Sequence, residues 1–346
     1  LVDWTRMRSL ELGFYGAFMP DEVGGGGLGS LAMVALKEEI ANSGSLLAHC
    51  VLGDVDGPSP LLLDSNDHIR ENYLLPSMRA EKASCFALSE PNAGSDAASI
   101  ETTAVRNGGS YLLNGTKHMV SQGAHADYAI IFAVTNKALR ARGGISCFVV
   151  DMDTPGLTIT RAQRPMGGPS EPVEIALEDC AVPASNLVGQ EGFGFVMAMR
   201  WLGDGRLAMA ATAIGLAELL LDLSVEHAKN RVQFGAPIAK KGAVQHMIAD
   251  MATELYAARM MVYETARKAD QGMDILRECS MTKLFATEMV NRAADTALQI
   301  HGGMGYMRDC IVERIFRDVR AMRIGEGTSE IHRMIIAKSL LRETSN

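Results

Sequence analysis

The 346-residue sequence lacks the patterns that mark several classes of protein. Its six cysteines form no Cys-x-x-Cys pair and have no regular spacing, so neither a disulfide framework nor a zinc knuckle is readable, and we expect reduced, buried thiols and no metal site. No apolar run approaches the roughly 20 residues that span a bilayer, and residues 1–20 show no basic stretch followed by an apolar one. We therefore expect a soluble protein without a membrane span, located in the cytoplasm, or in the mitochondrial matrix if a leader has been removed.

The sequence also lacks an excess of positive charge. The net charge is −8, with 47% hydrophobic and 21% charged residues, a composition typical of compact soluble domains. The acidic balance gives no general attraction to nucleic acid or to an anionic membrane. At about 150 residues per domain, the length predicts two or three structural units.

The chain reads as helices, then strands, then helices. Residues 1–82 contain two helical patterns, Trp4 to Gly13 and Leu31 through Ala41, around a glycine-rich loop at 20–29. Residues 83–189 contain short β-rich runs between turn residues, which predict a small antiparallel sheet. These runs are 111–113, 128–134, 145–150, 157–160 and 173–177. Residues 190–346 have helical periodicity, with an apolar stripe at spacings of three and four from Val244 to Val262 and further helices at 207–223 and 283–298.

This order of elements argues against a doubly wound parallel sheet and predicts an α+β multidomain protein. The acidic and glycine-rich stretch Asp21–Gly27 lacks the preceding strand, the Lys and the Ser/Thr of a P-loop, so we interpret it as a turn.

Two segments of the β region carry residues suited to a ligand. Phe86–Asp96 starts as a strand and runs into a turn of small and hydroxyl residues, and Asn114–Gly123 is interpreted as a hairpin return to the same place. Backbone N–H groups and serine hydroxyls in such turns suit a phosphate or the edge of a heteroaromatic ring. Taken singly, each segment is better explained as a solvent-exposed turn.

Four later segments complete a set with those two. They are Gly205-Arg206 at the start of an Ala-rich helix, Arg231–Pro237, Gln299–Tyr306 and Ile324–Ile331. In order and spacing the set resembles the acyl-CoA dehydrogenase family over essentially the whole chain. The resemblance implies a helical N-terminal domain (1–82, without the family's first helix or so), a β domain (83–189) and a C-terminal four-helix bundle (190–346), with FAD between the last two.

The resemblance also implies which residues bind FAD. Those expected along the isoalloxazine and ribityl chain are Phe86, Leu88, Ser89, Gly94, Ser95, Met119, Val120 and Ser121. Those expected at the adenosine and pyrophosphate of a neighbouring subunit's FAD are Arg231, Phe234, Gln299, Gly302 and Gly303, and Thr328 and Glu330 are further cofactor residues. A shared site implies a homodimer or homotetramer. His301, beside this segment, is interpreted as a packing or capping residue.

Glu326 is the catalytic base that the resemblance implies. Removal of a weakly acidic α-proton from an acyl thioester needs a desolvated carboxylate with a pKa near neutrality. From its residues alone, Glu326 would be a charge at a helix N-terminus. Some family members carry the base at the position of Gly205, which cannot act as one. The substrate residues implied are Ser95, Asp204, Arg206, Gly325 and Gly327.

Three positions depart from the family pattern. Met119 replaces an aromatic residue against the flavin, which makes reaction with oxygen more conceivable. Gly325 replaces a Tyr and removes a phenol from the acyl pocket, so we expect a bulky or branched acyl group. Gly242 stands where a Gln commonly contacts the cofactor, although Gln245 is close.

The expected function is therefore FAD-dependent oxidation of an acyl-CoA to the trans-2-enoyl-CoA, with an electron-transfer flavoprotein as acceptor. A flavin oxidase or monooxygenase of the same fold, a dehydrogenase of acyl-carrier-protein thioesters and a flavin-free binding protein are the alternatives.

Overall fold

A computed structural model describes residues 1–168 and 171–343. Contacts divide these residues into two compact units. The sheet unit comprises residues 1–28, 49–165 and 171–202, and the bundle unit comprises residues 29–48, 166–168 and 203–343. The three domain boundaries expected from the sequence stay a prediction. Helix α2 (Ser30–Asn42) belongs to the bundle unit because its Val34 joins the bundle core and its Glu38 accepts from Arg259 Nε at 2.6 Å.

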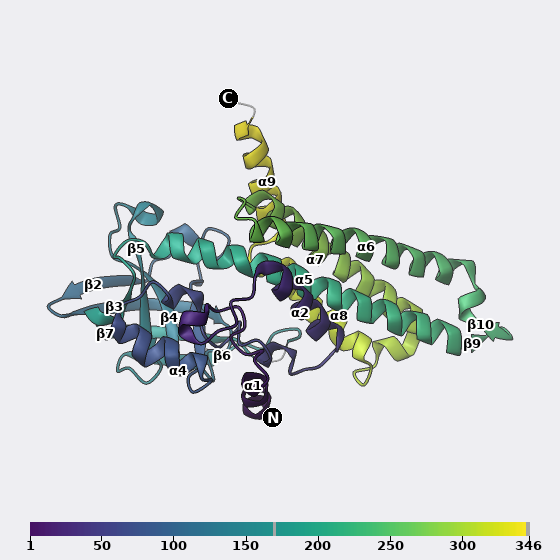
Figure 1. Ribbon diagram of the computed structural model, residues 1–346, viewed down its shortest axis with the longest axis horizontal. Coiled ribbons are helices and arrows are strands. Elements are labelled where there is room, and N and C mark those ends of the chain that lie inside the picture. Colours follow the sequence, from purple (N-terminus) through teal and green to yellow (C-terminus); the bar gives the residue numbers. More distant parts are fainter. Residues whose placement is uncertain (169–170, 344–346) are drawn as a thin grey trace. The chain divides into compact units, whose positions relative to one another are not determined.

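The sheet unit is built on one mixed sheet, drawn in the blue and teal part of Figure 1. Its strand order is β6-β7-β3-β2-β4-β5-β8, and β1 pairs with β4. The strands are β1 Ser84–Ala87, β2 Thr103–Asn107, β3 Ser110–Val120, β4 Tyr128–Val134, β5 Ile145–Asp151, β6 Leu157–Ala162, β7 Val173–Pro183 and β8 Leu187–Val188.

The five predicted runs are all strands, and most pairs are antiparallel, but β1 and β2 both run parallel to β4. Strands β4 and β5 are apolar on both faces because both faces are covered, which is why their runs lack alternation.

The interpretation of Asn114–Gly123 as a hairpin return is wrong at its start, because no turn lies at Asn114-Gly115. Both residues lie inside the continuous strand β3, where Gly115 occupies an irregularity in the register with β7. Asn114 Oδ1 accepts from the Asp179 backbone N–H at 2.8 Å, so its side chain bonds across the sheet instead of making a turn. The true hairpin joins β2 to β3 at residues 107–110, where Gly108 has φ +59°.

The helices of the sheet unit are short. They are α1 Val2–Glu11, α3 Asp67–Ile69 and α4 Leu75–Met78. Helix α1 is the predicted first helix, shifted by two residues. The glycine-rich loop forms a single 3₁₀ turn at Asp21–Val23, as the interpretation of this stretch as a turn requires.

The bundle unit contains the long helices. They are α2, α5 Gly194–Asn230, α6 Gly242–Asp270, α7 Leu276–His301, α8 Ile311–Arg320 and α9 Ser329–Glu343, and α5 begins in the sheet unit. In Figure 1, α6, α7 and the part of α5 that follows residue 203 lie side by side. Buried side chains of these three helices form one apolar core. The predicted stripe on α6 is buried at Met251, Leu255, Ala258 and Val262.

Among the described residues, α5 is the one helix that is long and apolar enough to cross a membrane. The core helix of a soluble protein can have the same length and composition. Ala210, Ile214 and Leu220 of α5 are buried in the bundle core.

Candidate functional site

Glu326 lies in a strained turn between α8 and α9, which we call the Glu326 turn (residues 325–328). Glu326 has φ +55° and Gly327 has φ +96°, so two consecutive residues are left-handed. For a residue with a Cβ this conformation is uncommon, and such strain gathers at functional sites. Thr328 Oγ1 accepts from the Ile331 backbone N–H at 3.3 Å, which ends the turn and starts α9.

The Glu326 carboxylate lies directly against the backbone of α5. A Cβ built on Gly205 would be 3.0 Å from Glu326 Oε2 and 3.1 Å from its Cδ, which is tighter than ordinary contact. Glu326 Oε2 is buried and has no hydrogen-bond partner within the part of the chain that the structure describes. A buried, unpaired carboxylate oxygen costs free energy, so this arrangement indicates a group held for reaction with a ligand.

Three side chains from three helices hold the main chain of the Glu326 turn. His332 Nε2 of α9 lies 3.2 Å from the Glu326 carbonyl oxygen, and Arg206 Nε of α5 donates to the same oxygen at 3.4 Å. Lys283 Nζ of α7 donates to the Gly327 carbonyl oxygen at 2.7 Å. The carbonyl oxygens next to the carboxylate are therefore bound, while its own Oε2 is left unpaired.

Burial sets the charge of these groups. It raises the pKa of Glu326 to about 7, against the opposing effect of the Arg206 and Lys283 charges. It lowers the pKa of Lys283 to about 8 and that of His332 to about 4. Near neutral pH His332 is a neutral imidazole that donates from Nε2, and Glu326 exchanges a proton readily.

In the sheet unit, the two segments expected to bind FAD lie side by side. The His118 backbone N–H donates to the Ser89 carbonyl oxygen at 2.8 Å, and Lys117 Nζ donates to the Leu88 carbonyl oxygen at 3.2 Å. Met119 follows with φ +56° and 65% of its surface exposed. Val120 is buried, so its side chain packs into the sheet core.

The groups at the ends of these two segments suit the flavin of FAD. Ser95 and Ser121 are exposed, and a Cβ built on Gly94 would meet nothing within 4 Å. Hydroxyl donors, open backbone and an exposed apolar Met119 side chain are the groups that the polar edge and apolar face of a flavin ring require.

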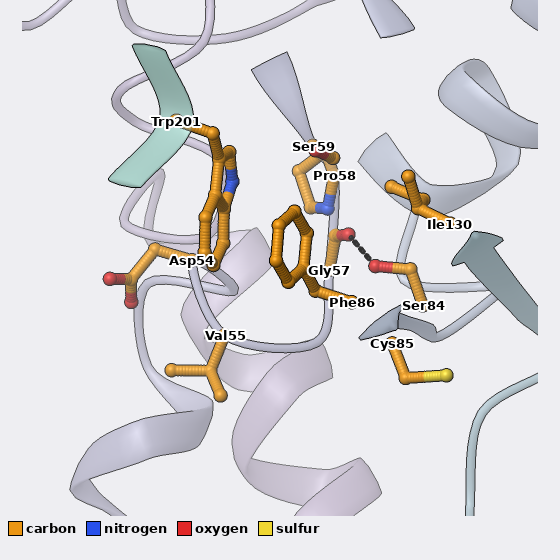
Figure 2. Close-up of a pocket in the computed structure, with 10 residues that line it drawn as sticks. All are labelled: Asp54, Val55, Gly57, Pro58, Ser59, Ser84, Cys85, Phe86, Ile130 and Trp201. Atoms are coloured by element: carbon orange, nitrogen blue, oxygen red, sulfur yellow. Dashed lines mark hydrogen bonds between the residues drawn. The ribbon is translucent and has the colours of Figure 1, made fainter. Parts of the chain in front are cut away.

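Phe86 is partly buried in β1, two residues before Leu88. Figure 2 shows its ring stacked on Trp201, with ring centroids 4.3 Å apart and planes 10° from parallel. The two rings border a cavity of about 20 Å³, room for about one water molecule and too small for an acyl group. Its other lining residues are Asp54, Val55, Gly57, Pro58, Ser59, Ser84, Cys85 and Ile130.

In the bundle unit, the expected diphosphate residues gather at one end. The rings of His227 on α5 and His301 on α7 stack at 4.4 Å, so the helix ends that precede Arg231 and Gly302 lie together. His301 is thus a packing residue, as expected. Phe234, in the β9–β10 turn (β9 Val232–Gln233, β10 Ala236–Pro237), has φ +53° and is 94% exposed. Arg231, Gln299, Gly302 and Gly303 are also exposed.

The expected substrate residues of the bundle unit lie around the Glu326 turn. Asp204 and Arg206 flank Gly205 on α5, and Gly325 and Gly327 flank Glu326 itself. A Cβ on Gly325 would be 3.4 Å from Met209 Cε, close but tolerable contact. Of the remaining expected residues, Glu330 is exposed in the first turn of α9, and Ser95 lies in the sheet unit.

Sequence reasoning missed Lys283 and His332. Lys283 follows Cys279 by four residues on α7 and precedes Ala286 by three, and all three are buried. A lysine within an apolar helical stripe was the available signal. His332 gave no such signal, because only its contact with the Glu326 carbonyl oxygen marks it.

Comparison with known proteins finds similarity along nearly the whole chain. Models of the acyl-CoA dehydrogenase N-terminal, middle and C-terminal domains match residues 3–81, 85–180 and 191–341. The chain is 41% identical to the 3-(aryl)acrylate reductase of Clostridium sporogenes (97% of this chain, 89% of that protein). It is 40% identical to an acyl-CoA dehydrogenase of Bacillus subtilis (96% of this chain, 88% of that protein).

A solved structure is also similar to this chain. It is reported as "Electron transferring flavoprotein of Acidaminococcus fermentans: Towards a mechanism of flavin-based electron bifurcation" and matches with a TM-score of 0.91 and 36% identity, over 99% of this chain and 89% of that chain. The three matched domains and relatives at 40% identity or more over nearly the full length agree on one assignment. This chain belongs to the acyl-CoA dehydrogenase family of FAD-dependent oxidoreductases.

Proposed function

We propose that the chain oxidises an acyl-CoA thioester to its trans-2-enoyl thioester, with Glu326 as the base. Two hydrogens leave the substrate as a carbon–carbon double bond forms: the proton on Cα goes to the Glu326 carboxylate, and a hydride leaves Cβ. FAD, when bound, supplies the acceptor for that hydride.

The observation that carries this proposal is the state of the Glu326 carboxylate. Its Oε2 is buried and has no partner among the described residues, and its pKa is raised to about 7. A general base is most effective when its pKa is close to the working pH, and an unpaired oxygen is free to take a proton. The bound carbonyl oxygens of Glu326 and Gly327 keep the turn in place as the carboxylate changes charge.

Gly325 supports a bulky or branched acyl group. It stands next to the base, and its missing side chain leaves space bordered by Met209. A relative at 41% identity is named for a 3-(aryl)acrylate, a substrate with a ring next to the reacting carbons. We propose an electron-transfer flavoprotein as the electron acceptor, because the similar Acidaminococcus fermentans structure is described as an electron transferring flavoprotein.

We further propose a homo-oligomer in which each subunit contributes to its neighbour's FAD site. Phe234 supports it, because a phenylalanine that is 94% exposed beside an exposed Arg231 suits contact with another chain and an anionic ligand.

The test is an anaerobic titration of the FAD-loaded protein with straight, branched and aryl-bearing acyl-CoA thioesters, followed by flavin absorbance. We expect bleaching by a bulky class, no bleaching in Glu326→Gln, and normal bleaching in Glu264→Gln, where an exposed carboxylate paired with Arg267 is changed. Absence of bleaching with every CoA thioester would contradict the proposed reaction, and strong preference for butyryl-CoA would contradict the wide pocket. Rapid reoxidation of the bleached flavin by air would favour the oxidase alternative.

A further inference from the structure

Lys283 is a buried cation that forms no ion pair with a carboxylate of the described residues; the charges of Glu326 and Glu288 act on it only from beyond ion-pair distance. Its side chain on α7 is fully buried, and within the described ranges 1–168 and 171–343 no ion pair joins it to a carboxylate. Its hydrogen bond goes to a neutral group, the Gly327 carbonyl oxygen, at 2.7 Å. Removing an ammonium from water costs free energy that one bond to a carbonyl repays only in part, so stability does not explain a lysine here.

The bond from Lys283 falls on the part of the chain that is under strain. Gly327 follows Glu326, and both residues are left-handed, at φ +96° and φ +55°. A strained conformation persists only where its surroundings hold it. The contacts of His332 and Arg206 reach the Glu326 carbonyl oxygen at 3.2 and 3.4 Å, so Lys283 makes the shortest of the three bonds to this turn.

We propose that Lys283 is a positioning residue for the base: its ammonium holds the Glu326 turn through the Gly327 carbonyl, which keeps the carboxylate against Gly205. The proposal depends on the proposed function of Glu326. Without this bond the turn can relax, and the unpaired carboxylate can move away from the α5 backbone toward solvent.

The charge of Lys283 adds a second effect. The charged groups that act on Glu326 are Arg206 from α5 and Lys283 from α7, and the neutral His332 faces it from α9. The charges that act on Lys283 are those of Glu326, Arg206 and, least, Glu288, and Asp204 and Cys279 belong to the same surroundings. Loss of the Lys283 charge leaves Arg206 as the one cation acting on Glu326 among the described residues, so ionisation of the carboxylate becomes harder.

The test uses the FAD-loaded, full-length protein and the variant Lys283→Met, with Lys338→Met on the exposed side of α9 as the matched control. Hydrogen–deuterium exchange reports on the turn without any substrate. We expect amides of residues 324–328 to exchange about tenfold faster in Lys283→Met and at the wild-type rate in Lys338→Met. With the thioester found by titration, we expect kcat to fall about 10- to 100-fold at little change in KM, and the acidic limb of the pH profile to move to higher pH.

Lys283→Gln separates the two effects, because it retains an N–H donor and loses the charge. It should restore slow exchange while the pH limb stays shifted, and it serves as the variant of choice if Lys283→Met does not fold. Unchanged exchange at 324–328 together with an unmoved pH limb would overturn the proposal. If the wild-type protein oxidises no thioester, the proposed function fails, and the exchange measurement still decides whether Lys283 holds the turn.

Discussion

Each unit of this protein contains a fully buried lysine and a glutamate with a buried carboxylate oxygen, Glu90 in one and Glu326 in the other, with opposite consequences. In the sheet unit, Lys117 Nζ donates to Glu90 Oε1 at 2.7 Å, and Glu90 also accepts from the Thr102 backbone N–H at 3.0 Å. In the bundle unit, Lys283 donates to a backbone carbonyl, and Glu326 Oε2 has no partner in the described chain.

The two sites differ in the group that accepts the lysine hydrogen bond, a carboxylate for Lys117 and a backbone carbonyl for Lys283. Burial acts to raise the pKa of Glu90, but the charge and hydrogen bond of Lys117 and the backbone donors outweigh it and lower that pKa. Around Glu326, burial outweighs the nearby charges, and the pKa rises to about 7. The same two residue types therefore form a structural ion pair in one unit and a group able to exchange protons in the other.

The largest expected effect is the loss of activity when the Glu326 carboxylate, but not the Glu90 carboxylate, is replaced by an amide. Glu326→Gln retains the shape of the side chain and removes the base, so the rate constant of flavin reduction should fall by about 10²- to 10⁴-fold. Its thermal midpoint should stay the same or rise, since an unpaired buried carboxylate is removed. Anaerobic stopped-flow and thermal unfolding measure both, and a retained rate would refute the role of Glu326.

The reverse result is expected for the ion pair. Lys117→Met leaves the Glu90 carboxylate buried without its cation, which should lower the free energy of unfolding by about 3–5 kcal/mol. Double substitution with Glu90→Gln should recover part of this loss. Thermal or denaturant unfolding checks it, and a loss below 1 kcal/mol, about a fivefold change in the unfolding equilibrium, would mean that the pair is not coupled.

The pH dependence of the two quantities should run in opposite directions. The folded-state pKa of Glu326, about 7, lies above its ordinary value of 4.5. The contribution of Glu326 to stability is therefore present in full below pH 4.5 and is lost as the pH rises through 7. The flavin reduction rate should rise about tenfold per pH unit below 7 and then level off. Comparison with Glu326→Gln across this range isolates both trends, and parallel profiles of the two proteins would contradict the assignment.

The smallest expected effect on the flavin reduction rate comes from Gly205, where the α5 backbone contacts the Glu326 carboxylate. Gly205→Ala places a Cβ 3.0 Å from Glu326 Oε2, so the carboxylate must shift, and we expect the reduction rate to fall about tenfold. Gly203→Ala is the matched control on the same helix, because a Cβ there meets nothing within 4 Å and should stabilise the protein by about 0.5–1 kcal/mol. Equal rates in both variants would show that Gly205 does not position the base.

Local patterns predicted much of the secondary structure. The run from Tyr128 to Val134 is a strand with those bounds, and the α6 stripe is buried from Met251 to Val262. Period and composition suffice where a segment has one dominant partner surface. They failed at Asn114-Gly115, where a turn signal was overridden by a cross-strand bond to Asp179, and they did not find β2, which pairs with β3 and meets β4 in parallel.

By itself, the sequence determined the family and the order of helices and strands, because both depend on residue types at fixed spacings, and the family resemblance then singled out Glu326 as the expected base. Only the tertiary structure decided that Gly205 lies against the carboxylate, that Lys283 binds Gly327 and that Glu90 is paired while Glu326 is not. Those outcomes depend on burial and on contacts between residues 27 to 121 positions apart, and a pKa follows its surroundings rather than the residue type.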